Sequence, residues 1–441
     1  MIFAKALRGD LEGGTLAALI YRPWYDTASL PLLVRYFFPL SRAWAAAVAC
    51  RGDAACFVAD FPGRPAPSSL VLRHVAACAD AHDVAEAAWR QRFFGDEPSG
   101  LEAADRKRRR ASFRLMARRS TLLGAHLRRP FPSVRYAVEP PEAAAAKVRP
   151  APFALSETPP VIERSHAIAR PGGGRRFWIR FSAPHDVTDD TCWVRIDEPA
   201  GEPAATVVFA HGICMEDEAW DAGLGAPERL AQSVRVISPE GPWHGRRRLE
   251  GHYGGEPILA RGPAGLADYF AAHIRELGHL IAWARETYGS PVGLFGISLG
   301  ALTSQLVLTA ARDWPAAARP DAALLTSSGE SIDTVVFNGS LTAGLGVAEA
   351  LSGWQAEDLD RMRPLLDPEG PPATDVGRIV IVLGERDVIV PFESGIARAK
   401  LWGIPPENLF VRNQGHFGVS LGLTAAPAPL ERFVALLRQA A

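Results

Sequence analysis

The stretch from Val292 to Leu302 reads V-G-L-F-G-I-S-L-G-A-L, and it decides how the rest of the chain is interpreted. A short apolar run leads directly into Gly296-Ile297-Ser298-Leu299-Gly300, and a helix-compatible segment follows. A strand, a G-x-S-x-G turn and a helix in this order predict a nucleophile elbow, a sharp turn that exposes a serine hydroxyl. Side chains at positions 296 and 300 would collide with the neighbouring strand and helix, so both positions need glycine. Ser298 is therefore the candidate nucleophile.

Short β-rich runs alternate with helical segments on both sides of this turn. An antiparallel pair is expected first, and the later strands alternate with helices, which predicts an α/β fold with a mostly parallel, doubly wound sheet. Ligands of such sheets bind at the carboxyl ends of the strands. The expected strands are Phe177–Phe181, Cys192–Ile196, Thr206–Ala210, Val234–Ser238, Val292–Phe295, Ala322–Leu325, Ile379–Leu383 and Leu409–Arg412. The expected helices of this part are Leu266–Glu286, Ala301–Arg312, Glu393–Leu401 and Leu430–Gln439.

An acid and a histidine follow the last two expected strands. Asp387 ends the turn G-E-R-D after the strand at 379–383, and it is the candidate for orienting a histidine, with Glu385 in the same turn as the alternative. His416 lies in the turn G-H-F-G and is the only histidine after Asp387. The order Ser298, Asp387, His416 predicts a serine that a histidine deprotonates, with the aspartate holding the imidazole.

Backbone N–H groups near the elbow are candidates for an oxyanion hole. The strand at 206–210 ends in His211-Gly212-Ile213, and we expect the N–H of Ile213 to act together with that of Leu299. Cys214 is the second choice for the loop donor. His211 itself is interpreted as a turn residue rather than a base, and it remains a candidate for substrate contact.

The loop after the strand at 234–238 supplies further substrate-binding candidates, Trp243, His244 and Arg246. An arginine at this rim can bind a carboxylate or phosphate of a substrate. The alternative is that the arginines brace the loop or the N-terminal region. The histidines of this region have no convincing metal partners, so we expect no metal site and no cofactor.

These motifs together resemble the α/β-hydrolases from about residue 175 to residue 441. The resemblance is carried by H-G-I at 211–213, G-I-S-L-G at 296–300, G-E-R-D at 384–387 and G-H-F-G at 415–418. It implies Ser298 as nucleophile, His416 as general acid/base and Asp387 as its orienter. It also implies a lid at about 331–375. The loop at 238–248 resembles the P-x-x-G-x-R loop of a branch of these hydrolases that carries a long N-terminal extension.

The resemblance implies hydrolysis of a carboxylic ester, or of a thioester, through an acyl-enzyme. Apolar residues in the expected lid favour a small-molecule substrate with an apolar acyl or alcohol group. An acyltransferase, an amidase or a lyase with the same three residues is the alternative. A different alternative is an inactive hydrolase fold that a basic N-terminal helix recruits to membranes or partners.

Residues 1–150 are expected to form a mainly helical N-terminal domain with a Pro- and Ala-rich linker, and 151–441 the catalytic domain. Helical patterning covers Ser41–Cys50 and Val71–Trp89. Basic and apolar residues are interleaved at 106–129. This pattern is typical of a helix that lies on an anionic membrane surface, of one that binds an acidic partner, and of a solvated helix face paired to acids elsewhere in the chain.

The composition excludes several classes of protein. In 441 residues, hydrophobic residues make up 48% and charged residues 22%, which is ordinary for a globular protein, and the net charge of −1 argues against a nucleic-acid binder. No apolar run is long enough for a membrane-spanning helix. Five cysteines without C-x-x-C spacing predict reduced thiols in a cytoplasm. The usage of Ala, Arg and Pro is typical of a GC-rich bacterial genome. The sequence makes no prediction of the oligomeric state.

Overall fold

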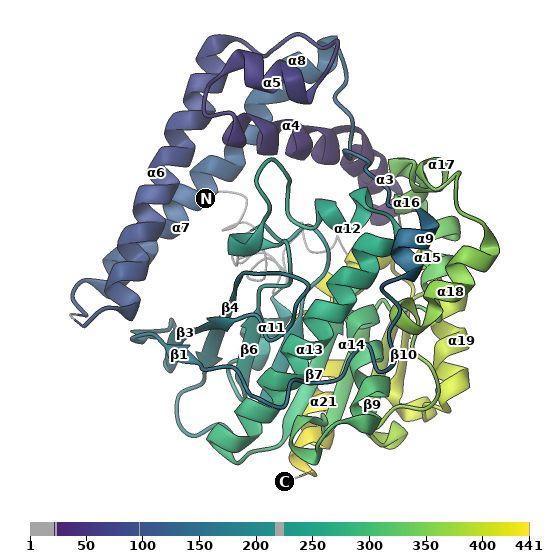
Figure 1. The fold of residues 1–441 in the computed structure, drawn as a ribbon. Helices are drawn as coiled ribbons and strands as arrows, with labels where there is room; N and C mark the ends of the chain where they lie inside the picture. Colours follow the sequence, from purple (N-terminus) through teal and green to yellow (C-terminus); the bar gives the residue numbers. More distant parts are fainter. Residues whose placement is uncertain (1–21, 23, 97, 217–224, 441) are drawn as a thin grey trace.

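The computed structural model describes residues 22, 24–96, 98–216 and 225–440, and a ten-stranded sheet lies at its centre (Figure 1). The strands from β6 to β10 in the sheet are parallel, and β1, β3 and β4 form an antiparallel extension at one side. In sheet order they are β1 (Glu163–Arg164), β3 (Arg175–Ser182), β4 (Thr191–Glu198), β6 (Arg235–Pro239), β5 (Thr206–Ala210), β7 (Val292–Ile297), β8 (Ala322–Thr326), β9 (Ile379–Gly384) and β10 (Leu409–Arg412), with β2 (Ile168–Ala169) paired to β3.

The eight strands that the sequence predicts are all present, and their ends differ from the prediction by about two residues at most. The central strands are buried along their whole length, as in β5, β7, β8 and β9. Strands covered on both faces read as continuous apolar runs, which is why they were readable from the sequence. The two-residue strands β1 and β2 are too short to give such a signal.

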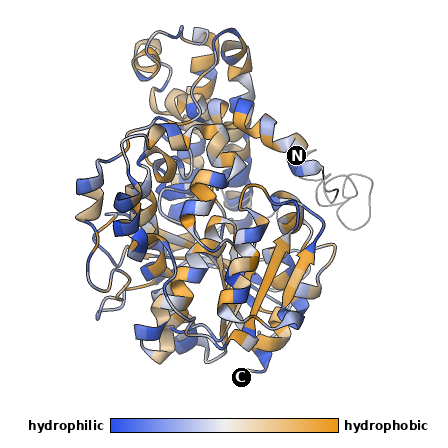
Figure 2. Cartoon of the chain, turned by 90° about the vertical axis from the view of Figure 1, so that its right-hand side faces the viewer, coloured by the Kyte–Doolittle hydropathy of each residue, from blue (hydrophilic) through white to orange (hydrophobic). Residues whose placement is uncertain are grey.

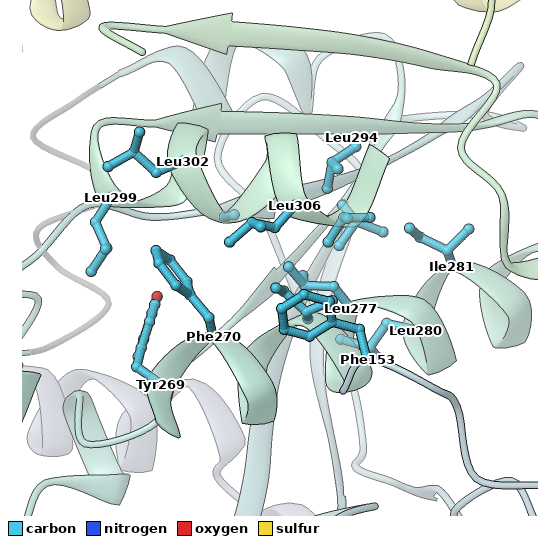
Figure 3. Packing of buried hydrophobic residues seen from close by; sticks show 14 of the residues in the cluster. Phe153, Tyr269, Phe270, Leu277, Leu280, Ile281, Leu294, Leu299, Leu302 and Leu306 are labelled. Atoms are coloured by element: carbon cyan, nitrogen blue, oxygen red, sulfur yellow. The ribbon is translucent and has the colours of Figure 1, made fainter. Parts of the chain in front are cut away.

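Helices cover both faces of the sheet and bury alternate residues of each strand. One face packs against α13 (Pro263–Tyr288), α14 (Leu299–Ala310) and α19 (Phe392–Trp402), and the other against α11 (Ala226–Leu230), α20 (His416–Leu421) and α21 (Ala428–Arg438). Figure 3 shows the first of these layers, in which Phe270 and Leu277 of α13 lie close to Leu306 of α14 and Leu294 of β7. The mostly parallel, doubly wound sheet is therefore confirmed.

The described part of the N-terminal region is helical. Its helices are α3 (Tyr25–Leu32), α4 (Phe38–Ala49), α5 (Ala54–Asp60), α6 (Ser69–Phe94), α7 (Leu101–Ala117), α8 (Leu123–Arg128) and the short α9 (Pro141–Ala145). Helices α6 and α7 run side by side as a long pair, while α4, α5 and α8 lie above the sheet (Figure 1). Figure 2 shows that these upper helices project from the sheet-containing body. The expected domain boundary near residue 150 stays a prediction.

The structure contains a disulfide between Cys50 and Cys56, so the prediction of reduced thiols throughout is wrong for this pair. Cys50 follows the end of α4 and Cys56 lies in the first turn of α5, and the tight connection brings their Cα atoms to 5.5 Å. This distance is within the range that a disulfide spans. The remaining three cysteines are free thiols in the structure. A spacing of six residues has no motif by which the sequence could have revealed the pair.

Part of the apolar side of the basic segment at 106–129 packs inside the protein, while Phe113, Leu123 and Leu127 are exposed. Leu115 and Leu122 are buried in the cluster that joins the N-terminal helices. Two of its arginines are buried as well: Arg108 pairs with Asp105 at 2.9 Å, and Arg119 pairs with Glu216 at 2.9 Å. The segment is thus partly an internal structural element. No helix within the described ranges is both long and apolar enough to cross a membrane.

Four helices follow β8 at the position expected for a lid. They are α15 (Ile332–Asn338), α16 (Ser340–Leu345), α17 (Val347–Ala350) and α18 (Ala356–Leu366). They lie beside the carboxyl ends of the parallel strands, on the same side as α12 (Glu256–Ala260) in Figure 1. The N-terminal region supports this segment, because the Tyr136 hydroxyl donates to the carbonyl of Leu345 at 3.0 Å.

Candidate active site

Ser298 lies at the sharp turn between β7 and α14. Its backbone has φ 56° and ψ −121°, a strained combination for a residue with a side chain. The flanking glycines make the turn possible: a Cβ at Gly300 would lie 2.0 Å from the carbonyl oxygen of Ala210, and one at Gly296 would lie 2.3 Å from the carbonyl oxygen of Gly300. The collisions expected from the sequence are therefore present in the structure.

The structure brings Ser298, His416 and Asp387 into one hydrogen-bonded chain. The Ser298 hydroxyl lies 2.9 Å from His416 Nε2, and His416 Nδ1 lies 2.8 Å from Asp387 Oδ2. Because an ionised carboxylate can only accept, Nδ1 carries the proton and Nε2 accepts from the serine hydroxyl. The other carboxylate oxygen of Asp387 accepts from the N–H groups of Ile389 and Val390 at 3.0 and 2.9 Å.

Strand ends position these three side chains. Ser298 follows β7, Asp387 lies in the turn after β9, and His416 begins α20 after β10. The alternative acid, Glu385, is exposed to solvent in the same turn. His416 is buried, which by itself would lower the pKa of its imidazole, but the facing carboxylates of Asp387 and Asp26 raise the pKa above its ordinary value. Asp26, which comes from α3, was not predicted from the sequence as a residue of this site.

The loop expected to hold the oxyanion lies beside the serine. Ile213 and Leu299 both line the same cavity as Ser298. His211 fixes this loop: its Nδ1–H donates to the carbonyl of Gly212 at 2.7 Å, and its Nε2 accepts from the N–H of Gly241 at 2.9 Å. Burial lowers the pKa of His211 to about 4, so the imidazole is neutral at physiological pH.

Trp243 and His244 face the interior rather than the serine. Trp243 is 5% exposed and belongs to the buried apolar cluster that α13 and α14 form with the sheet. His244 is fully buried, its Nδ1–H donates to the carbonyl of Pro242 at 2.9 Å, and burial holds its pKa well below the ordinary value. With their side chains enclosed by protein, neither residue has a surface for substrate, and the expectation of substrate contact is corrected for both and for His211.

Arg246 braces the N-terminal region, which was the alternative that the sequence left open. Its guanidinium contacts the carboxylates of Glu86, at 2.8 Å, and of Glu240. It also lies 4.9 Å from the ring centroid of Trp89 and 5.3 Å from that of Trp193. Since its donors are directed at these two acids and its faces at indole rings, Arg246 is placed in an interface between α6 and the β-sheet body and not at the serine.

A strongly apolar cavity opens beside the Ser298 hydroxyl. Among the described residues that line it, only Ser298, Asp333 and Thr342 have polar side chains. Asp333 is paired with Arg363 at 3.0 Å, and the Thr342 hydroxyl donates to backbone carbonyls. The apolar lining comes from the loops after β5 and β9, from α12, α13 and α14, and from the helices after β8: Ile213, Ile258, Leu259, Pro263, Leu266, Leu299, Leu302, Ile332, Val335, Val336, Phe337, Leu341, Val347, Leu351, Leu359, Leu366, Ile389 and Val390.

The sheet order, the elbow after β7 and the positions of the acid and the histidine after later strands define the α/β-hydrolase fold. No protein-family model and no curated protein matches the chain.

Several solved structures are similar to it. One is acetyl xylan esterase 1 from Thermoanaerobacterium sp., with 14% identity, 68% of this chain and 96% of that chain covered, and a TM-score of 0.45. A cold-adapted esterase from an Arctic intertidal metagenomic library is 18% identical, with 62% and 96% covered and a TM-score of 0.40. An acylaminoacyl peptidase from Pyrococcus horikoshii is 11% identical, with 64% and 48% covered and a TM-score of 0.37.

Proposed function

We propose that the protein is a serine hydrolase that cleaves a carboxylic ester with an apolar acyl group. The observation that carries this proposal is the hydrogen-bonded chain Ser298–His416–Asp387, whose serine lines an apolar cavity. A serine hydroxyl is a poor nucleophile at neutral pH, and a neutral imidazole that accepts its proton overcomes this limit.

The reaction follows from this arrangement. Ser298 Oγ attacks the acyl carbon while His416 Nε2 takes the hydroxyl proton, and Asp387 stabilises the imidazolium that forms. The N–H groups of Ile213 and Leu299 would bind the oxyanion, each contributing on the order of 10² to 10³ in rate. His416 then returns its proton to the leaving alcohol. Water, deprotonated by the same histidine, releases the acid and restores the serine.

The apolar cavity supports an apolar acyl chain as the bound group. Burial of each methylene contributes about 0.8 kcal/mol, so a cavity lined by aliphatic side chains selects for chain length. The helices α15–α18 would act as the lid, because Val335, Val336 and Leu341 of this segment form part of the cavity wall. No described lining residue carries a basic side chain, so the cavity itself offers no partner for a carboxylate or phosphate.

The experiment that tests the proposal is labelling of the folded protein with a fluorophosphonate probe, followed by peptide mapping. We expect a covalent adduct on Ser298 that is lost in Ser298→Ala and in His416→Ala, together with loss of p-nitrophenyl ester turnover. Ser352→Ala, at an exposed serine, is the matched control and should label as the wild type does. Absence of both adduct and turnover in the folded wild-type protein would contradict the proposal.

The acyl preference has its own test. We expect Val336→Trp to fill part of the cavity and to lower kcat/KM for p-nitrophenyl octanoate by tenfold or more, while that for the acetate changes about twofold at most. Val161→Trp is the control, since Val161 is 90% exposed. Equal losses of kcat/KM for both esters would show that the acyl chain of the substrate does not bind in this cavity.

A further inference from the structure

A carboxylate from the N-terminal helices reaches the turn that carries His416. Asp26, in the first turn of α3, is only 3% exposed, and its Oδ2 accepts from the N–H of Phe417 at 2.9 Å. Its Oδ1 is buried and has no hydrogen-bond partner among the described residues. An ionisable group placed this deep, with one oxygen unpartnered, is costly unless something nearby stabilises it.

The chain is shaped to let this carboxylate approach. Helix α3 packs against α20, and a Cβ at Gly415 would lie 2.4 Å from Cγ of Asp26. Only a residue without a side chain fits at position 415 while Asp26 stays where it is. The residue directly before His416 is therefore matched to Asp26, although the two positions are 389 residues apart (415 − 26 = 389).

Two acids face the imidazole. Asp387 from the β9 turn bonds Nδ1 directly, and Asp26 from α3 acts on the same ring through its charge. Burial and the charge of Asp387 raise the pKa of Asp26, whereas the N–H groups of Phe417 and Gly418 and the proximity of His416 lower it. A proton gained by His416 places a positive charge that both carboxylates stabilise, in a buried site from which water is largely excluded.

We propose that Asp26 is a positioning residue of this site, which holds the His416 turn through the N–H of Phe417 and stabilises the imidazolium that forms on His416. This inference rests on the proposed function for its catalytic meaning, but the coupling between Asp26 and His416 is a property of the folded protein. The N-terminal extension would thereby complete the active site rather than merely cover it.

The test compares Asp26→Asn with the wild type in the full-length protein. An amide oxygen can still accept from Phe417, so the substitution removes the charge and keeps the turn. The imidazole signals of histidine are followed by NMR as a function of pH, with His416→Gln identifying the signal of interest. We expect His416 to titrate at lower pH in Asp26→Asn. Asp53→Asn, which removes one charge at a helix N-cap of the same region, should leave it unchanged.

Ester turnover gives the second readout. In Asp26→Asn we expect kcat to fall about tenfold, with KM unchanged because Asp26 does not line the cavity, and the acidic limb of kcat/KM to move to lower pH. Asp26→Ala should lower kcat further than Asp26→Asn does, because the buried N–H of Phe417 then lacks its acceptor.

The outcomes separate the two proposals. A His416 titration identical in wild type and Asp26→Asn would overturn the role of Asp26, whatever the activity. A titration that shifts in a protein without ester turnover would support the coupling and contradict the proposed function.

Discussion

At the scale of single residues, the proposed mechanism depends on one histidine that is neutral when it begins the reaction and charged in the transition state. His416 is held between the Ser298 hydroxyl and the Asp387 carboxylate, and the charge of Asp26, which bonds the next residue, also acts on it. The carboxylates raise the pKa of His416 although burial opposes them. A stronger base takes the serine proton more readily, but it also stays protonated, and inactive, up to a higher pH.

The pH dependence of activity follows from this balance. Since the neutral imidazole is the active form and its pKa is raised, kcat/KM should rise with pH through a midpoint above the ordinary histidine value of 6.5. In Asp387→Asn we expect that midpoint to fall and kcat to drop by about 10⁴, because the imidazole loses its orienting acceptor. Initial rates of wild type and Asp387→Asn, measured from about pH 4 to about pH 9, check both the midpoint and the drop in kcat. A profile in Asp387→Asn that keeps the wild-type midpoint would contradict the assignment.

At the scale of elements, strands could be predicted from the sequence far better than the docking of helices. Residues such as Val292 and Ile379 begin fully buried strands, whose apolar runs are a local signal. The order of Ser298, Asp387 and His416 was equally readable, because each follows such a run. The positions of Asp26 and Arg246 could not be predicted from the sequence. Each depends on a contact between an N-terminal helix, α3 for Asp26 and α6 for Arg246, and a loop that is distant in the sequence.

Arg246 shows how strongly such a contact can act. Its side chain is 9% exposed and contacts that of Glu86, which is 10% exposed, whereas Arg90 bonds the same carboxylate with a side chain that is 42% exposed. Burial would raise the pKa of Glu86, but Arg246 and Arg108 hold it at about 2. The folded-state pKa is therefore depressed, and the stabilisation is present above the unfolded-state value and lost as pH falls from about 4 to about 2.

Arg246→Ala should accordingly lower the free energy of unfolding by about 3–5 kcal/mol at pH 7, because it leaves a buried acid without a main partner. Arg90→Ala, the matched control, should cost about 0.5 kcal/mol. Urea unfolding at pH 7 measures both. Labelling of Ser298 in the folded fraction of Arg246→Ala should be close to that of wild type, since Arg246 lies outside the cavity. Similar losses of stability in the two variants would contradict the buried role of Arg246.

At the scale of the whole molecule, the N-terminal helices and the hydrolase fold share one core. A single apolar cluster contains Trp44 and Leu115 of the helical region together with Leu345 and Leu351 of the segment after β8. Ion pairs cross the same boundary, since the buried Arg42 lies 3.2 Å from Glu256. The N-terminal region thus supports the segment after β8 and the His416 turn at once.

A shared core predicts that the protein unfolds in one step. Regions with separate cores unfold in separate transitions, whereas removal of either region here exposes apolar surface of the other. Differential scanning calorimetry of the full-length protein should show one transition, with a calorimetric enthalpy equal to the van't Hoff enthalpy. Arg42→Ala removes the guanidinium that Glu256 faces across the boundary. We therefore expect the midpoint temperature of the whole transition to fall by several degrees, since each kcal/mol of lost stability lowers it by about 2–4 °C. Two resolved transitions, of which only the first moves in Arg42→Ala, would show instead that the N-terminal helices fold as an independent unit.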